Sequence, residues 1–108
     1  MKFELGNHVA LQHPDWKESD SFYKDVLGLD TSLEGNHLHI RSGELNLYIM
    51  ENDELRGTVM EFNVEDVEAA KDHLLAHGCM VVKWEGKGQD CYMRDPYGLV
   101  FNLWENRV

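Results

Sequence analysis

Basic residues are scarce in this sequence, and so are cysteine, proline and long apolar runs. Ten lysines and arginines stand against twenty aspartates and glutamates, which gives a formal net charge of −10. This charge repels nucleic-acid phosphates and anionic lipid, so neither a nucleic acid nor a membrane is an expected partner. No apolar run approaches the ~20 residues of a membrane-spanning helix, and the first residues lack the apolar segment of a signal peptide. We therefore expect a cytoplasmic location.

The low cysteine content limits the ways in which the fold is stabilised. Cys79 and Cys91 are the only cysteines, too few for a secreted disulfide framework. We expect two buried thiols in a reduced compartment. With 108 residues, 43% of them apolar, the chain is long enough to bury a core without disulfide or metal staples.

Hydropathy periodicity predicts the same order of elements twice. Strands are predicted at 8–13, 29–33, 37–41 and 45–50, with a helix at 16–27 that ends at Gly28; the second set has strands at 58–64, 79–84, 90–94 and 99–105, with a helix at 66–77 that ends at Gly78. The sequence thus predicts an α+β fold of two βαβββ modules within a single domain, 1–108. The modules span about 6–51 and 57–106, and a polar linker joins them at about 52–56.

A short internal repeat supports this duplication. The stretch Leu45-Asn46-Leu47-Tyr48 aligns with Phe101-Asn102-Leu103-Trp104. By strand alternation, the apolar residues Leu45, Leu47, Phe101 and Leu103 should pack under the helices. The opposite faces should form a curved, cup-shaped mixed sheet that faces a ligand or a second module. Its predicted ligand-binding residues are His8, Gln12, His39, Asn46, Tyr48, Glu61, Asn102 and Trp104.

Three segments resemble one known family. Residues 22–29 (FYKDVLGL) are similar to the helix exit of the vicinal oxygen chelate superfamily, 61–67 (EFNVEDV) to the strand-to-helix entry of its second module, and 94–98 (RDPYG) to the turn before its last strand. That superfamily includes glyoxalase I, bleomycin-resistance proteins, fosfomycin-modifying enzymes and extradiol dioxygenases. The resemblance implies the glyoxalase/bleomycin resistance fold, which hosts several chemistries.

The resemblance also implies where a metal would bind. The ligand positions of metal-using members fall on His8, Asn46, Val59 and Asn102, and only His8 is a strong ligand. Because a catalytic divalent site needs about three such ligands, no cofactor is expected. A rebuilt site of His8, His39 and Glu61 is the chemically sensible alternative. The pair His73 and His77 has zinc-binding spacing, but we interpret it as the exposed end of a helix.

The cup residues favour binding over a named reaction. Aromatic walls with a few amides, a carboxylate and an imidazole suit a flat organic molecule. The leading hypothesis is a metal-free, homodimeric binder of a small organic ligand, similar to the bleomycin-resistance branch. The alternatives are a metal-dependent lyase or isomerase of the glyoxalase I type, and a structural or regulatory module without a ligand. If the chain is an enzyme, His8 and Glu61 are the candidate catalytic residues, with Glu61 as a base.

Overall fold

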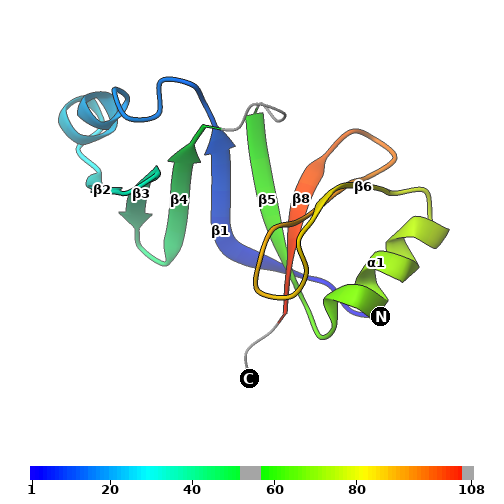
Figure 1. Ribbon diagram of the computed structural model, residues 1–108. Helices are drawn as coiled ribbons and strands as arrows, with labels where there is room; N and C mark the ends of the chain where they lie inside the picture. Colours follow the sequence, from blue (N-terminus) through cyan, green and yellow to red (C-terminus); the bar gives the residue numbers. More distant parts are fainter. Residues whose placement is uncertain (52–56, 106–108) are drawn as a thin grey trace. The chain divides into compact units, whose positions relative to one another are not determined.

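The computed structural model describes residues 1–51 and 57–105, and the chain divides into two compact units (Figure 1). The N-terminal unit is Asn7–Val59, and the C-terminal unit combines Met60–Val108 with Met1–Gly6. The predicted linker, 52–56, lies outside the described residues. The elements in chain order are β1 (Glu4–Gln12), η1 (Phe22–Val26), β2 (Asp30–Glu34), β3 (His37–Ser42), β4 (Leu45–Met50), β5 (Gly57–Val64), α1 (Val67–Ala76), β6 (Met80–Trp84), β7 (Cys91–Arg94) and β8 (Val100–Glu105).

The N-terminal unit has a mixed sheet in the order β2-β3-β4-β1. Strand β1 runs parallel to β4, whereas β2, β3 and β4 pair antiparallel. One face buries Leu38, Ile40 and Ile49. The partly buried side chains that pack against them are Leu11, Trp16, Tyr23, Leu29 and Leu47. Strand alternation accounts for this face, because all three buried residues share one side of β3 and β4.

The predicted helix at 16–27 is wrong in extent. Helical backbone is confined to residues 20–26, and Phe22–Val26 of this segment form a short π-helix, η1, which lies against β2 (Figure 1). Before it, the Ser19 and Ser21 hydroxyls donate to the carbonyls of Trp16 and Glu18, at 2.6 and 3.4 Å. Serine and aspartate side chains compete in this way with regular helical hydrogen bonds. Phe22 is also half exposed, so burial of the expected apolar stripe does not compensate.

The C-terminal unit repeats the strand topology in the order β5-β8-β7-β6. Strand β5 is parallel to β8, and β6, β7 and β8 pair antiparallel. The helix α1 packs on β6 and β8 (Figure 1). Both units therefore show the predicted βαβββ order, with η1 in the place of the first helix, and the α+β fold class is confirmed.

The first turn of α1 is capped twice. Asp66 is the N-cap, and its carboxylate accepts from the Ala69 amide at 3.1 Å. The Glu105 carboxylate, on β8, accepts from the Val67 amide at 3.0 Å. Both contacts satisfy amides that have no partner within a helix. Gly78 then ends the helical segment with φ +93°, as the sequence predicts for a left-handed position.

The core of the C-terminal unit is larger than that of the N-terminal unit. Eight buried residues form it: Val64, Val67, Ala70, Cys79, Cys91, Met93, Phe101 and Leu103. Both cysteines are free and buried, as predicted. The expectation that Phe101 and Leu103 pack under a helix is confirmed. Leu45 is the counterpart of Phe101 in the N-terminal unit. It is 49% exposed, so the expectation that Leu45 packs under a helix is wrong.

Within residues 1–51 and 57–105, no helix has the length and apolarity needed to cross a bilayer.

Candidate functional site

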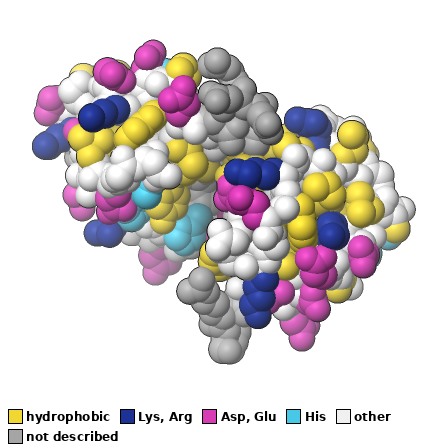
Figure 2. All heavy atoms as spheres, in the orientation of Figure 1, with side chains coloured by type: hydrophobic (Ala, Val, Ile, Leu, Met, Phe, Trp, Pro, Cys, Tyr) yellow, Lys and Arg dark blue, Asp and Glu magenta, His cyan; other side chains and the backbone are white. Residues whose placement is uncertain are grey.

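The sheet of the N-terminal unit has a polar face opposite its core. Residues His8, Ala10 and Gln12 of β1 stand in register with Asn46, Tyr48 and Met50 of β4. Tyr48 is in turn paired with His39 of β3. Strand alternation therefore places the predicted residues His8, Gln12, His39, Asn46 and Tyr48 on one face. We call this the histidine face; histidine side chains gather on the side of this unit seen in Figure 2.

Three aromatic rings stack across the histidine face. The Tyr48 ring lies between two imidazoles, with its centroid 5.5 Å from that of His8 and 4.6 Å from that of His39. Both pairs are within 10° of parallel. The Tyr48 hydroxyl also hydrogen-bonds His8 Nδ1 at 3.0 Å. Because each ring is held from the side by its neighbour, the orientations of the three rings are mutually fixed.

Both ring nitrogens of His39 lie near polar side chains. Asn46 Nδ2 donates to the Glu44 carbonyl at 3.4 Å, and Asn46 Oδ1 lies at hydrogen-bond distance from His39 Nε2, 2.9 Å. His39 Nδ1 lies 3.8 Å from Glu34 Oε1. His39, only 7% exposed, therefore positions Tyr48 rather than meeting solvent.

Glu34 and His37 are two residues that the sequence prediction did not include in the site. They face each other across the β2–β3 hairpin, with His37 Nε2 3.2 Å from Glu34 Oε2. His37 also packs edge-on to Tyr48, at 5.6 Å between centroids. The signal in the sequence was the shared parity of His37 and His39 on one strand. The role of Glu34 requires the hairpin register, which hydropathy alone does not fix.

Gln12 is the least exposed residue of the histidine face. It is 4% exposed, and neither Oε1 nor Nε2 has a hydrogen-bond partner among the described residues. Leaving a buried amide unpaired costs about 1–3 kcal/mol. Buried polar groups in folded proteins are nearly always hydrogen-bonded, so the Gln12 amide is an exception in this sheet.

The remaining predicted site residues lie in the C-terminal unit. Glu61 pairs with Asn102, and Asn63 with Trp104, across β5 and β8. Asn102 Oδ1 accepts from the Cys91 amide at 2.9 Å, so this side chain fixes the start of β7. A Cβ atom on Gly6 would stand 2.6 Å from Glu61 Oε2, so a side chain at this position would displace the flexible end of Glu61.

The buried ionisable groups of the C-terminal unit are kept neutral. Burial raises the pKa of the Cys79 and Cys91 thiols, so neither is an activated nucleophile. Burial, with Asp90 and Glu85 nearby, raises the pKa of the Tyr92 phenol to about 12. His77 Nδ1 donates to the His73 carbonyl at 2.8 Å, consistent with an exposed helix end rather than a zinc pair.

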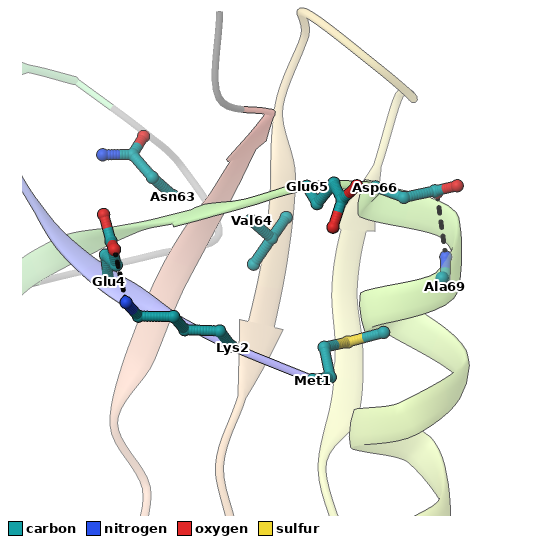
Figure 3. A pocket seen from close by; sticks show the side chains of 8 residues that line it. All are labelled: Met1, Lys2, Glu4, Asn63, Val64, Glu65, Asp66 and Ala69. Atoms are coloured by element: carbon teal, nitrogen blue, oxygen red, sulfur yellow. Dashed lines mark hydrogen bonds and ion pairs between the residues drawn. The ribbon is translucent and has the colours of Figure 1, made fainter. Parts of the chain in front are cut away.

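An open hollow of about 800 Å³ lies beside the N-terminus of α1 (Figure 3). It is lined by Met1, Lys2, Glu4, Asn63, Val64, Glu65, Asp66 and Ala69. The Lys2 ammonium forms an ion pair with the Glu4 carboxylate, with Nζ 3.1 Å from Oε1. Asp66 points to the Ala69 amide that it caps (Figure 3). The charged groups of this hollow therefore serve local structure.

A family model decides the relationship of the chain. The model described as "Glyoxalase/Bleomycin resistance protein/Dioxygenase superfamily" matches residues 6–103. The chain belongs to this superfamily. The match spans both βαβββ units, which confirms the resemblance inferred from the three sequence segments.

Solved structures show the same fold. A superfamily member from Vibrio splendidus 12B01 is 18% identical, covers 96% of this chain and 100% of its own, and superposes with a TM-score of 0.69. The Mn(II)-bound glyoxalase from Novosphingobium aromaticivorans is 20% identical and superposes with a TM-score of 0.59. The alignment covers 91% of this chain and 36% of the glyoxalase. Homoprotocatechuate 2,3-dioxygenase from Brevibacterium fuscum is 27% identical and superposes with a TM-score of 0.61. The alignment covers 94% of this chain and 35% of the dioxygenase. This chain thus spans about a third of each of those two enzymes. The comparison with curated proteins found no match.

The residues at the metal positions that the superfamily implies do not fit a divalent ion. Val59 has no donor atom and is buried. The amide oxygens of Asn46 and Asn102 are already hydrogen-bonded to His39 and to the Cys91 amide. Within the described residues, no three His, Cys, Asp or Glu side chains are grouped closely enough to hold an ion. His8 and His39 belong to one unit and Glu61 to the other, and their joint site stays a prediction.

Proposed function

We propose that this chain binds a small, flat organic molecule on the histidine face, without a divalent ion at the four family positions. The observation that carries the proposal is the Tyr48 ring held between two imidazoles, beside a buried amide with no partner among the described residues. Aromatic rings supply apolar contact area, and a few polar groups orient the ligand. This arrangement is typical of a binding site for a mixed-polarity organic compound.

The charge of the chain narrows the ligand class. A net charge of −10 disfavours polyanions such as nucleic acids. An uncharged or cationic aromatic compound meets no such barrier, and an aromatic contact with the edge of the ring stack contributes about 0.5–1.5 kcal/mol beyond its buried area. Binding of this type agrees with the resemblance to the bleomycin-resistance branch. Glu61, Asn102 and Trp104 stay proposed contacts.

A ligand screen by thermal denaturation tests the binding function. Compounds that stabilise the wild-type protein should lose their effect in Tyr48→Ala and keep it in Tyr97→Ala, because Tyr97 is 94% exposed. A screen of flat aromatic compounds with no stabilising member would contradict the proposal and favour a module without a ligand. So would compounds whose effect is equal in both variants.

Metal analysis tests the second part of the proposal. We expect far less than one equivalent of zinc, nickel or manganese to stay with the protein after incubation and dialysis. Stoichiometric metal that is lost in His8→Ala would overturn this part. That result would favour the alternative function, a metal-dependent lyase or isomerase of the glyoxalase I type.

A homodimer is part of the proposal. Exposed apolar side chains on β2 and β6, namely Leu33, Met80 and Val81, support it, because exposed apolar groups gain from burial in a symmetric interface. Light scattering coupled to size exclusion should give twice the chain mass of 12.5 kDa. A mass of one chain at micromolar concentration would contradict this part.

A further inference from the structure

Gln12 has a fixed position at the end of β1. The next backbone amide, that of His13, donates to the Met50 carbonyl at 2.8 Å. Gln12 itself stands in register with Met50, and Ala10 is the nearest residue of β1 on the same face. Neither Ala10 nor Met50 offers a strong hydrogen-bonding group. The amide of Gln12 is therefore buried and has no hydrogen-bonding neighbour at these two register positions.

This setting makes glutamine an expensive choice for packing alone. A methionine has nearly the same volume and would fill the position without an unpaired donor and acceptor. Both amide atoms of Gln12 have no partner among residues 1–51 and 57–105. The free protein therefore carries a desolvation cost that a suitable ligand would remove.

We propose that Gln12 is the polar anchor of the ligand site and selects an uncharged group with adjacent hydrogen-bond donor and acceptor: a carboxamide, lactam or imide. The inference rests on the proposed function, since it names the ligand class of the same face. A glutamine amide presents a C=O acceptor beside an N–H donor, and these groups pair with it in two parallel hydrogen bonds. A carboxylate has acceptors alone and leaves Gln12 Oε1 unpaired.

The aromatic part of such a ligand has a place on the same face. On β1, Ala10 lies between His8 and Gln12 on this face and stands in register with Tyr48. The stack of His8, Tyr48 and His39 therefore lies next to the position of Gln12. Ala10 carries the smallest side chain of this row. A planar ligand with an amide edge at Gln12 would extend over Ala10 toward the Tyr48 ring.

Four simple probes test the selection: benzamide, α-pyridone, benzoate and toluene. Binding is followed by ligand-observed NMR at millimolar concentrations with wild type, Gln12→Met and Gln89→Met. Gln89 is the other glutamine of the chain and is exposed. We expect benzamide and α-pyridone to bind wild type at least about tenfold more tightly than benzoate or toluene. Gln12→Met should abolish this preference and leave toluene unchanged, whereas Gln89→Met should keep it.

The outcomes separate the two proposals. Equal binding of all four probes to wild type, or a preference that survives Gln12→Met, would overturn the role of Gln12 and leave the binding function standing. No binding by any of the four probes, together with a negative library screen, would contradict the binding function as well.

Thermal denaturation of the free protein provides an independent test. Gln12→Met should raise the melting temperature by several degrees, because the unpaired amide is gone, and Gln89→Met should not change it. A lower melting temperature in Gln12→Met would show that the amide is already satisfied in the free protein, and would overturn the inference.

Discussion

The two units of this chain share one strand topology but differ in the size of their cores and in the side chains of their polar faces. The C-terminal unit buries eight core residues under a ten-residue, doubly capped helix. The N-terminal unit has three buried residues in its core cluster, and the N-cap side chain of its short π-helix accepts from no helix amide. Its polar face, in contrast, carries a stacked ring cluster and an unpaired buried amide.

The polar faces of the two units differ in the hydrogen-bond partners of their side chains. In the repeated sequence, Asn46 and Asn102 occupy equivalent places. Asn102 accepts from a backbone amide of its own sheet, whereas Asn46 orients the imidazole of His39. The two units therefore share a scaffold, and equivalent asparagines in it make different contacts.

The largest effect should come from the core of the C-terminal unit. Leu103→Ala removes a side chain that is 1% exposed and should lower the free energy of unfolding by about 2–5 kcal/mol. Leu45→Ala, at a half-exposed position of the other unit, should cost much less. Urea denaturation followed by circular dichroism measures both. Equal losses of stability would contradict the difference in core size between the two units.

Alkaline pH should weaken the C-terminal unit through Tyr92. Its pKa is about 12 in the folded chain and about 10 when exposed, so the unfolded state ionises first. Stability is then complete below pH 10 and is lost as the pH rises to 12, by up to about 2–3 kcal/mol.

Tyr92→Phe isolates this contribution. The variant should lose less stability than wild type between pH 10 and 12, while Tyr97→Phe should behave as wild type because Tyr97 is exposed. Chemical denaturation across this pH range measures the difference. A steeper loss in Tyr92→Phe than in wild type would show that the assigned pKa is wrong.

The helix caps should also differ between the units. Asp66→Ala removes the carboxylate that accepts from the Ala69 amide and should cost about 0.5–2 kcal/mol. Ser21→Ala, at the N-cap of η1, removes no capping hydrogen bond and should change stability by a few tenths of that amount. Thermal denaturation compares the two. An equal loss in both would mean that η1 is capped as α1 is.

A small loss of stability, about 0.5–1.5 kcal/mol, should come from Tyr48→Phe. The variant keeps the ring stack but removes the hydroxyl that hydrogen-bonds His8 Nδ1. The imidazole nitrogen resonances of His8 should shift, and those of His39, held by Asn46, should not. Nitrogen-detected NMR of the rings measures this. An unchanged His8 spectrum would rule out the hydrogen bond.

Strand alternation predicted much of this molecule, because a two-residue period fixes which side chains share a face. It placed His8, Gln12, Asn46 and Tyr48 together, as the register shows. It did not predict the loss of the helix at 16–27, where serine hydroxyls bond nearby carbonyls. Hydrogen bonds from these side chains compete with those of a helix but do not change the spacing of the apolar residues, so hydropathy periodicity does not reveal them.

The interactions within the candidate site required the structure. The contact of His39 Nε2 with Asn46 depends on the orientation of the Asn46 amide, which also bonds a backbone carbonyl. The contact of Glu34 with His37 depends on the hairpin register. The isolation of the Gln12 amide depends on the packing of every neighbour. Sequence patterns specify faces, whereas tertiary packing specifies which polar atoms are satisfied.

A backbone amide chemical-shift map during titration with benzamide tests the central claim most directly. We predict that the largest changes fall on the histidine face, at His8, Gln12 and Tyr48, and that the hollow lined by Lys2, Glu4 and Asp66 is unaffected. Changes confined to that hollow, with none at the three face residues, would contradict the assignment of binding to the N-terminal unit.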